Sequence, residues 1–167
     1  MLLLPSICPR GFTTSFANRL NNICRITVQE AKGGERVVPG HAYLAPGAQH
    51  LKLVRSGADY RIELDDGPRV SRHKPSVDVM FQSVAEAVGA NALAVILTGM
   101  GKDGALGIRS IAEQGGYTIA QDEETSLIFG MPQEAIKTGA VKKVLPLDKV
   151  SQHLIETLNL MGKEYRI

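Results

Sequence analysis

Tryptophan is absent from this sequence, and the other aromatic side chains are limited to four Phe and four Tyr among 167 residues. Platforms that stack nucleic-acid bases need aromatic side chains, so the chain offers little material for one. Charge of one sign is not concentrated either: 19 Lys and Arg face 17 Asp and Glu, for a net charge of +2. No basic block is long enough to attract a phosphate backbone. We therefore expect no nucleic-acid partner.

Cysteine is also scarce, and long hydrophobic runs are missing. Cys8 and Cys24 are the two cysteines, and neither a CxxC pattern nor a histidine at zinc-site spacing accompanies them. We expect reduced, structural thiols and no metal. The apolar run 2–4 ends at Pro5 and is too short for a signal peptide or a membrane span. These features predict a cytoplasmic protein without membrane insertion.

The composition that is present is typical of a folded globular protein. Hydrophobic residues make up 44% and charged residues 22% of the chain, which argues against disorder and coiled coil. A length of 167 residues suits one compact domain. We therefore treat residues 1–167 as a single domain.

Hydrophobic periodicity predicts a short amphipathic helix near the start, followed by strands. Residues 12–23 carry an apolar stripe at helical spacing, with Thr13 or Thr14 available as an N-cap. The stripe consists of Phe12, Phe16, Leu20 and Ile23. Strands are predicted at residues 25–29, 42–45, 50–54 and 60–64. The last two are expected to form a hairpin through the turn 55–59.

The second half alternates between strand and helix patterns. A helix from residue 77 that ends at Gly89 precedes an apolar run, Leu93–Thr98, that is typical of a strand buried on both faces. The elements that follow are a helix over 104–113, a strand over 117–121, a helix over 132–138, a strand over 143–146 and a helix over 150–160. This order predicts a doubly wound α/β fold with a largely parallel sheet and a β-hairpin insertion. Ligands of such sheets bind at the carboxyl ends of the strands.

One motif at such a strand end favours a dinucleotide site. Gly99, Gly101 and Gly104 form a literal GxGxxG, and acidic residues at 122–124 follow about 20 residues later, as the dinucleotide fingerprint requires. However, Lys102-Asp103 places a carboxylate where a pyrophosphate would approach. The alternative is that the glycines serve a tight turn between strand and helix.

A more specific interpretation comes from six blocks that occur in a fixed order. Together they closely resemble the catalytic domain of CheB, the chemotaxis protein-glutamate methylesterase, from Pro9 almost to Ile167. The blocks are 9–20 with Glu30-Ala31, then 38–47, 73–81, 96–105, 118–123 and 129–136.

The resemblance implies a Ser-His-Asp triad at the carboxyl edge of a parallel sheet. It further implies hydrolysis of glutamyl methyl esters and deamidation of glutamines on methyl-accepting chemoreceptors, which are the implied partners, with no metal or organic cofactor. Asp103 matches the acid of the triad, which orients the histidine. For an isolated Asp, a role in complementing the dipole of the following helix would be favoured. Met100 is a candidate wall of the substrate cleft, with simple packing as the alternative.

The chain also departs from the family. The Gly-x-Ser-x-Gly-Gly turn that carries the nucleophile is not in the sequence, and Ile7 stands where the family has its histidine. Cys8 is a thiol beside that position, but nothing in the sequence activates it. Ser76 is better explained as a helix N-cap. We interpret the histidines as surface or turn residues; they are His41, His50, His73 and His153.

We therefore expect a CheB-like catalytic domain that is incomplete at its N-terminus, lacks the first strand of the family's sheet and has no receiver domain. Three hypotheses remain: an esterase inactive on its own, a receptor-docking module without chemistry, and a dinucleotide-binding domain. The missing strand would expose a sheet edge that invites self-association, unless residues 2–4 fill the gap as a surrogate strand.

Overall fold

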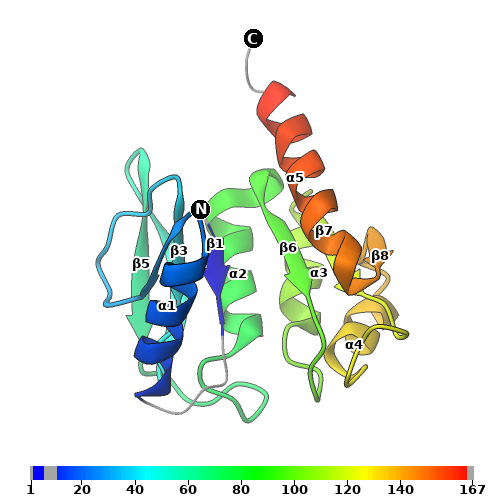
Figure 1. The fold of residues 1–167 in the computed structure, drawn as a ribbon, viewed down its shortest axis with the longest axis horizontal. Coiled ribbons are helices and arrows are strands. Elements are labelled where there is room, and N and C mark those ends of the chain that lie inside the picture. The colour runs from blue at the N-terminus through cyan, green and yellow to red at the C-terminus, as the bar shows by residue number, and fades with distance from the viewer. Residues whose placement is uncertain (1, 6–10, 165–167) are drawn as a thin grey trace.

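The computed structural model describes residues 2–5 and 11–164 and has a mixed α/β fold (Figure 1). Its strands are β1 (Leu2–Leu4), β2 (Thr27–Glu30), β3 (His41–Leu44), β4 (His50–Ser56), β5 (Asp59–Asp65), β6 (Leu93–Ile96), β7 (Tyr117–Gln121) and β8 (Lys143–Leu145). Its helices are α1 (Phe12–Ile23), α2 (Val77–Val88), α3 (Ala105–Glu113), α4 (Met131–Lys137) and α5 (Leu147–Glu164), with the short 3-10 helix η1 (Gly89–Asn91) after α2.

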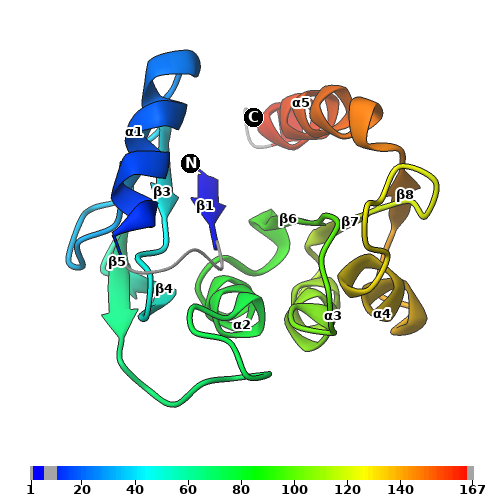
Figure 2. The ribbon, with the colours of Figure 1, turned by 60° about the horizontal axis from the view of Figure 1, so that its bottom comes forward.

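The strands form two parallel sheets and one hairpin. The sheets have the orders β1-β3-β2 and β6-β7-β8, and β4 pairs with β5 in antiparallel fashion. Figure 2 shows α5 on one side of β6-β7-β8 and α3 with α4 on the other. The predicted doubly wound α/β class is thus confirmed, with the parallel strands divided between two sheets. None of the helices among residues 2–5 and 11–164 has the length and apolar character that a membrane span requires.

The expected elements are present, with ends shifted by a few residues. The hairpin runs from the pair His50↔Asp65 to the pair Ser56↔Asp59. Residues 2–4, which we named only as a surrogate strand, form β1 and pair in parallel with β3. The largest shift is in α5, which spans Leu147–Glu164 and not the predicted residues 150–160.

Helix α1 is oriented differently from the prediction. Its buried residues are Thr13 and Ala17, whereas Phe12 is 66% and Ile23 73% exposed. The N-cap is Gly11 and not a threonine. The hydroxyls of the two predicted caps donate to the carboxylate of Glu30 on β2 instead, because they lie on the side of α1 that packs against that strand. The apolar stripe therefore faces the surface.

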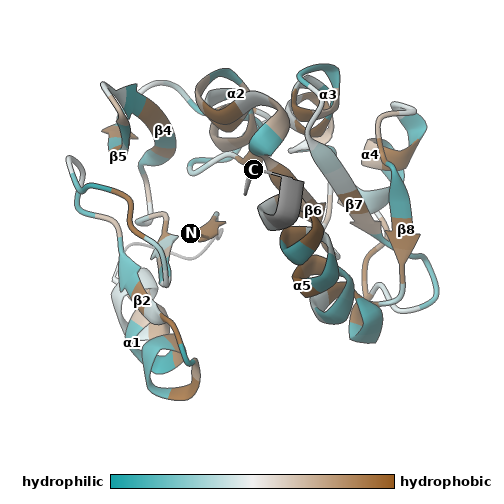
Figure 3. Cartoon of the chain, turned by 90° about the horizontal axis from the view of Figure 1, so that it is seen from above, coloured by the Kyte–Doolittle hydropathy of each residue, from teal (hydrophilic) through white to brown (hydrophobic). Residues whose placement is uncertain are grey.

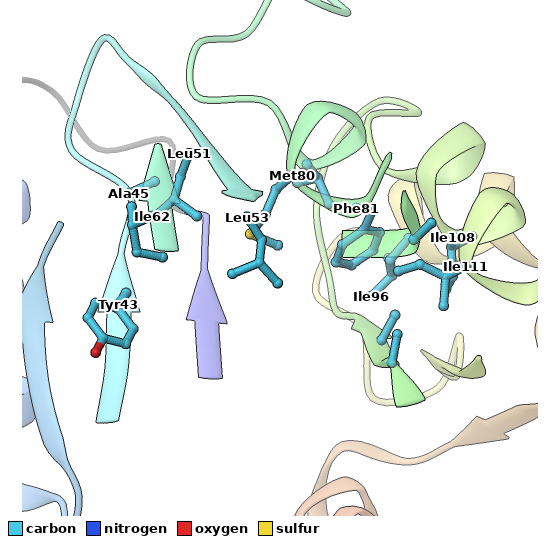
Figure 4. Packing of buried hydrophobic residues seen from close by; sticks show 14 of the residues in the cluster. Tyr43, Ala45, Leu51, Leu53, Ile62, Met80, Phe81, Ile96, Ile108 and Ile111 are labelled. Carbon is cyan, nitrogen blue, oxygen red and sulfur yellow. The ribbon is translucent and has the colours of Figure 1, made fainter. Parts of the chain in front are cut away.

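One continuous core joins the two halves of the chain. Tyr43 on β3 and Leu53 on β4 lie in the same buried cluster as Phe81 on α2, Ile96 on β6 and Ile108 on α3. Figure 4 shows that Met80 and Phe81 stand between the hairpin side and the β6 side of this cluster. Helix α2 therefore links the two parallel sheets.

On the other side of the molecule, β1 and β6 are the edge strands at which the two parallel sheets face one another (Figure 2). We call these two edges the inner edges of the sheets. Within the described residues each pairs on one side only, β1 with β3 and β6 with β7. The carbonyl of Ala92 accepts a hydrogen bond from Tyr117 N. Because peptide groups alternate in direction along a strand, those of Leu93 and Val95 point away from β7. As far as the described residues go, the two sheets therefore have unpaired backbone groups along their inner edges.

Candidate active site

The loop between β6 and α3 lies at the carboxyl end of a buried parallel strand, and glycines let it pack closely. Gly104 has φ +94°, and a Cβ there would lie 2.8 Å from Val77 Cγ1. A Cβ at Gly99 would overlap the side chain of Met131. The amide nitrogens of Gly130 and Met131 both donate to the carbonyl of Gly99. The loop is thus held from two sides, by α2 and by the start of α4.

Asp103, the predicted acid, is in this loop and is only 1% exposed. Its Oδ1 accepts from Ser76 Oγ at 2.7 Å and from Asp78 N at 3.0 Å, and its Oδ2 accepts from Val77 N at 2.8 Å. These donors form the N-terminal end of α2, so Asp103 caps that helix and not the helix that follows it in sequence. A carboxylate has about four acceptor positions. One position on Oδ2 therefore has no donor among the described residues.

Asp78 lies in the first turn of α2 and is 2% exposed. Its Oδ1 accepts from Gly107 N, in the first turn of α3, at 2.8 Å. Burial raises the pKa of Asp78, and the nearby charge of Asp103 acts in the same direction. Hydrogen bonds from the backbone amides of Gly107 and its neighbours act in the opposite direction. A second buried carboxylate therefore lies beside the predicted acid.

Ser76, His50 and Asp103 meet in the structure, but they are not connected as a catalytic triad. Ser76 is fully buried and donates its hydroxyl to Asp103, while its backbone N donates to His50 Nδ1 at 3.1 Å. Since Nδ1 accepts, the ring proton is on Nε2, which donates to the carbonyl of Pro68 at 2.9 Å. The histidine cannot take a proton from this hydroxyl. Ser76 Oγ also accepts from Val79 N, which confirms the predicted N-cap.

The remaining predicted residues differ in their surroundings. Met100 is 75% exposed beyond the end of β6, so packing does not explain it. His50 is 1% exposed, and the prediction of a surface or turn position is wrong for it because β4 is covered by α2. The ring of His153 reaches Tyr117 Oη at 3.0 Å. Cys24 is free but exposed, so it is not a structural thiol. Ile7 and Cys8 lie outside the described residues.

The structure also gives the GxGxxG loop a packing role. Gly99 and Gly104 make close contacts with Met131 and Val77, as described above. The amides at the start of α3, where a pyrophosphate would bind, already have the carboxylate of Asp78 as a partner. The arrangement favours the turn interpretation over a dinucleotide site. Among the described residues, no group of three His, Cys, Asp or Glu side chains is placed to bind a metal.

Residues 3–154 match the family model described as CheB methylesterase. The chain belongs to the CheB methylesterase family. Similar proteins include the protein-glutamate methylesterase/protein-glutamine glutaminase of Pectobacterium atrosepticum, 55% identical over 166 residues, which are 99% of this chain and 47% of the relative. The protein of the same name from Thiobacillus denitrificans is 57% identical over 97% of this chain and 46% of its own length. The chain thus spans about half the length of these curated relatives.

The fold comparison agrees with the CheB family assignment. The crystal structure of the Thermotoga maritima CheB methylesterase catalytic domain matches with a TM-score of 0.90 and 41% identity, over 93% of this chain and 82% of that one. The predicted family and fold class are therefore confirmed. The sequence patterns did not single out Asp78, although it lies in the block 73–81 that resembles the family. The available signal was an Asp in the first turn of an apolar helix, a pattern ordinarily explained by the helix dipole.

Proposed function

We propose that the protein acts in protein-glutamate methylester hydrolysis and glutamine deamidation on methyl-accepting chemoreceptors, and that this chain contributes the acid-bearing part of the site. The observation that carries the proposal is the buried carboxylate of Asp103 at the carboxyl end of β6, in a chain of the CheB methylesterase family. Three donors fix its orientation, and one acceptor position on Oδ2 has no donor among residues 2–5 and 11–164. A histidine N–H bonded at that position would be held in the orientation that a triad requires.

The 167 residues alone are expected to be inactive. Ile7 has no proton-accepting atom, and the sequence has no Gly-x-Ser-x-Gly-Gly turn. Losing triad members removes a factor of about 10⁴ or more from the rate. The proposal includes a cytoplasmic location, where the free thiol of Cys24 stays reduced.

The test is methanol release from a methylated chemoreceptor incubated with the purified 167-residue chain. We expect release at the background rate. Turnover at the rate of a serine esterase would contradict the expectation of an inactive chain, and its loss in Cys8→Ala would identify the thiol as the nucleophile. Adding an active relative as a positive control shows that the receptor preparation is a competent substrate.

The second candidate function, receptor docking without chemistry, is favoured by the exposure of Met100. A methionine that is 75% exposed at the carboxyl edge of the sheet gives a partner an adaptable apolar contact. Calorimetry measures the dissociation constant for a methylated receptor segment. We expect this constant to increase about tenfold in Met100→Asp. Val144→Asp, at a residue that is 44% exposed on β8 and separated from β6 by β7, is the control. Equal binding by all three proteins would rule out this contact.

We further propose that copies of the chain associate through the face formed by α1, β1, β6 and α5. The inner edges of β1 and β6 are unpaired within the described residues, and unpaired edges favour strand addition. Helices α1 and α5 on this side of the molecule both contain hydrophobic residues, which are brown in Figure 3. The exposed ones include Phe12, Phe16, Ile155, Leu158 and Leu160.

Light scattering over a range of concentrations tests the association. We expect oligomers that bind a hydrophobic dye, and a weaker association in the double variant Phe12→Ser with Phe16→Ser. Leu106→Ser is the control, because Leu106 is 62% exposed on α3, which lies on the opposite side of β6-β7-β8 from α5 (Figure 2). A monomer at every concentration, or an equal effect of the control, would exclude association through this face.

A further inference from the structure

Helices α2 and α3 exchange carboxylates at their N-termini. Asp103 precedes α3 in sequence, yet it accepts from the amides of Val77 and Asp78 at the start of α2. Asp78 belongs to α2, yet it accepts from the amide of Gly107 at the start of α3. A carboxylate at a helix N-terminus accepts from amides that have no partner within the helix. Helix α2 therefore depends on an aspartate from the loop before α3, and α3 depends on an aspartate from α2.

The two helices are in contact at this point. A Cβ at Gly107 would lie 2.5 Å from Phe81 Cβ and 3.1 Å from the carbonyl oxygen of Asp78. Since there is no room for a methyl group between the helices, the first turn of α3 cannot shift without moving α2. Asp103 and its loop are attached to that same turn. The position of the Asp103 carboxylate is thereby coupled to the bond between Asp78 and Gly107.

Both carboxylates are buried, and the exchange also affects the pKa of Asp78. Burial raises the pKa of Asp78, and the negative charge of Asp103 adds to this effect, while the amides of Gly107, Gly104 and Leu106 stabilise the ionised form. The first turn of α3 therefore favours the ionised form of Asp78, in opposition to burial. Conversely, the amide of Gly107 has a hydrogen-bond acceptor only while Asp78 accepts from it.

We propose that Asp78 is a positioning residue for Asp103. By binding the first turn of α3, Asp78 fixes the loop that carries Asp103, so that the Asp103 carboxylate keeps its three donors from α2 and its one remaining acceptor position on Oδ2. The role of Asp103 in ester hydrolysis rests on the proposed function. The carboxylate exchange between α2 and α3 does not rest on the proposed function, and its test does not measure enzyme activity.

The test compares Asp78→Ala with Asp78→Asn by amide hydrogen exchange and NMR. The alanine variant removes the acceptor for Gly107 N. We expect the amide of Val77, which reports the bond to Asp103 Oδ2, to exchange at least about tenfold faster relative to the amide of Ile119 in the core of β7. The asparagine variant keeps an acceptor oxygen, so we expect its ratio of Val77 to Ile119 exchange rates to equal that of the unmodified chain. Asp148→Ala, in the exposed first turn of α5, is expected to leave it unchanged.

A second measurement needs no substitution, so the proposal remains testable if the alanine variant does not fold. In the unmodified chain, the amide resonances of Gly107 and Val77 are followed as the pH is lowered. We expect both to shift with one midpoint, because protonation of Asp78 alters both ends of the exchange, and we expect this common shift to disappear in Asp78→Asn.

A Val77 resonance that does not follow that of Gly107 would overturn the proposal. So would an alanine variant in which Val77 and Ile119 lose protection equally, which indicates general destabilisation. Methanol release separately tests the function.

Discussion

The two parallel sheets are joined on one side of the molecule and remain apart on the other. On the joined side, α2 and α3 touch at Gly107, and Asp78 and Asp103 are buried with hydrogen-bond partners. On the open side, β1 and β6 have unpaired inner edges in the described part of the chain. Figure 2 shows α1 and α5 on that side. The joined side therefore contains the core that links the two halves and fixes the geometry of the candidate acid.

The largest expected effect is that of Asp103→Ala on the joined side. The substitution leaves the hydroxyl of Ser76 and the amides of Val77 and Asp78 without their acceptor. Each buried donor without a partner costs about 1–3 kcal/mol, so we expect a loss of about 3–5 kcal/mol in the free energy of unfolding by urea. Asp148→Ala, which removes an exposed acid, is expected to change stability by less than about 0.5 kcal/mol. A similarly small loss in Asp103→Ala would show that α2 does not depend on this carboxylate.

Two glycines in helices allow the joined side to be tested by packing alone. A Cβ at Gly107 would lie 2.5 Å from Phe81 Cβ, whereas one at Gly162 in α5 would meet nothing within 4 Å. Gly107→Ala is expected to cost about 1–3 kcal/mol through overpacking. Gly162→Ala is expected to stabilise by up to about 1 kcal/mol through helix propensity. Thermal unfolding of both variants checks the signs, and stabilisation by both would contradict the close contact of α2 with α3.

Local patterns in the sequence predicted the elements better than their surroundings. Alternation and turn residues were sufficient for the hairpin of β4 and β5 and for strand β7, because neighbouring residues determine them. The stripe of Phe12 and Phe16 predicted the correct helix but the wrong buried face. Which face is buried depends on where β2 lies, and the distant Glu30 attracts the threonine side of α1.

The candidate site was predicted only in part for the same reason. Asp103 could be matched by family resemblance, but its partners come from a helix that begins 26 residues earlier in the chain. The burial of His50 and the role of Asp78 likewise depend on contacts between distant segments. A first-turn aspartate is ordinarily explained by its own helix dipole. Only the three-dimensional contact of α2 with α3 shows that the carboxylate of Asp78 accepts from the neighbouring helix.

The smallest expected effect concerns the pH dependence of stability, and two aspartates predict opposite signs. The pKa of Asp78 is raised in the folded chain, first by burial. The unfolded chain then loses its proton at lower pH than the folded chain, so the ionisation of Asp78 lowers stability as the pH rises from about 3.8 through the folded pKa. The pKa of Asp65 is lowered, first by its bond to Lys52 and then by the amide of Gly67. Its ionisation adds stability that is lost as the pH falls through the folded pKa.

Asparagine at each position separates these effects, because its amide oxygen still accepts from the backbone while its charge is fixed at zero. Asp78→Asn is expected to be more stable than the unmodified chain at pH 7, an advantage that shrinks as the pH falls toward 3.8 and is absent below it. Asp65→Asn is expected to be slightly less stable at pH 7, and this deficit also disappears in acid. Urea unfolding of the three proteins at intervals between pH 3 and pH 7 measures both differences. An Asp78→Asn chain that is less stable at pH 7 than at pH 3, relative to the unmodified chain, would mean that the amides of α3 outweigh the burial of Asp78 and that the charge of the exchange is itself stabilising.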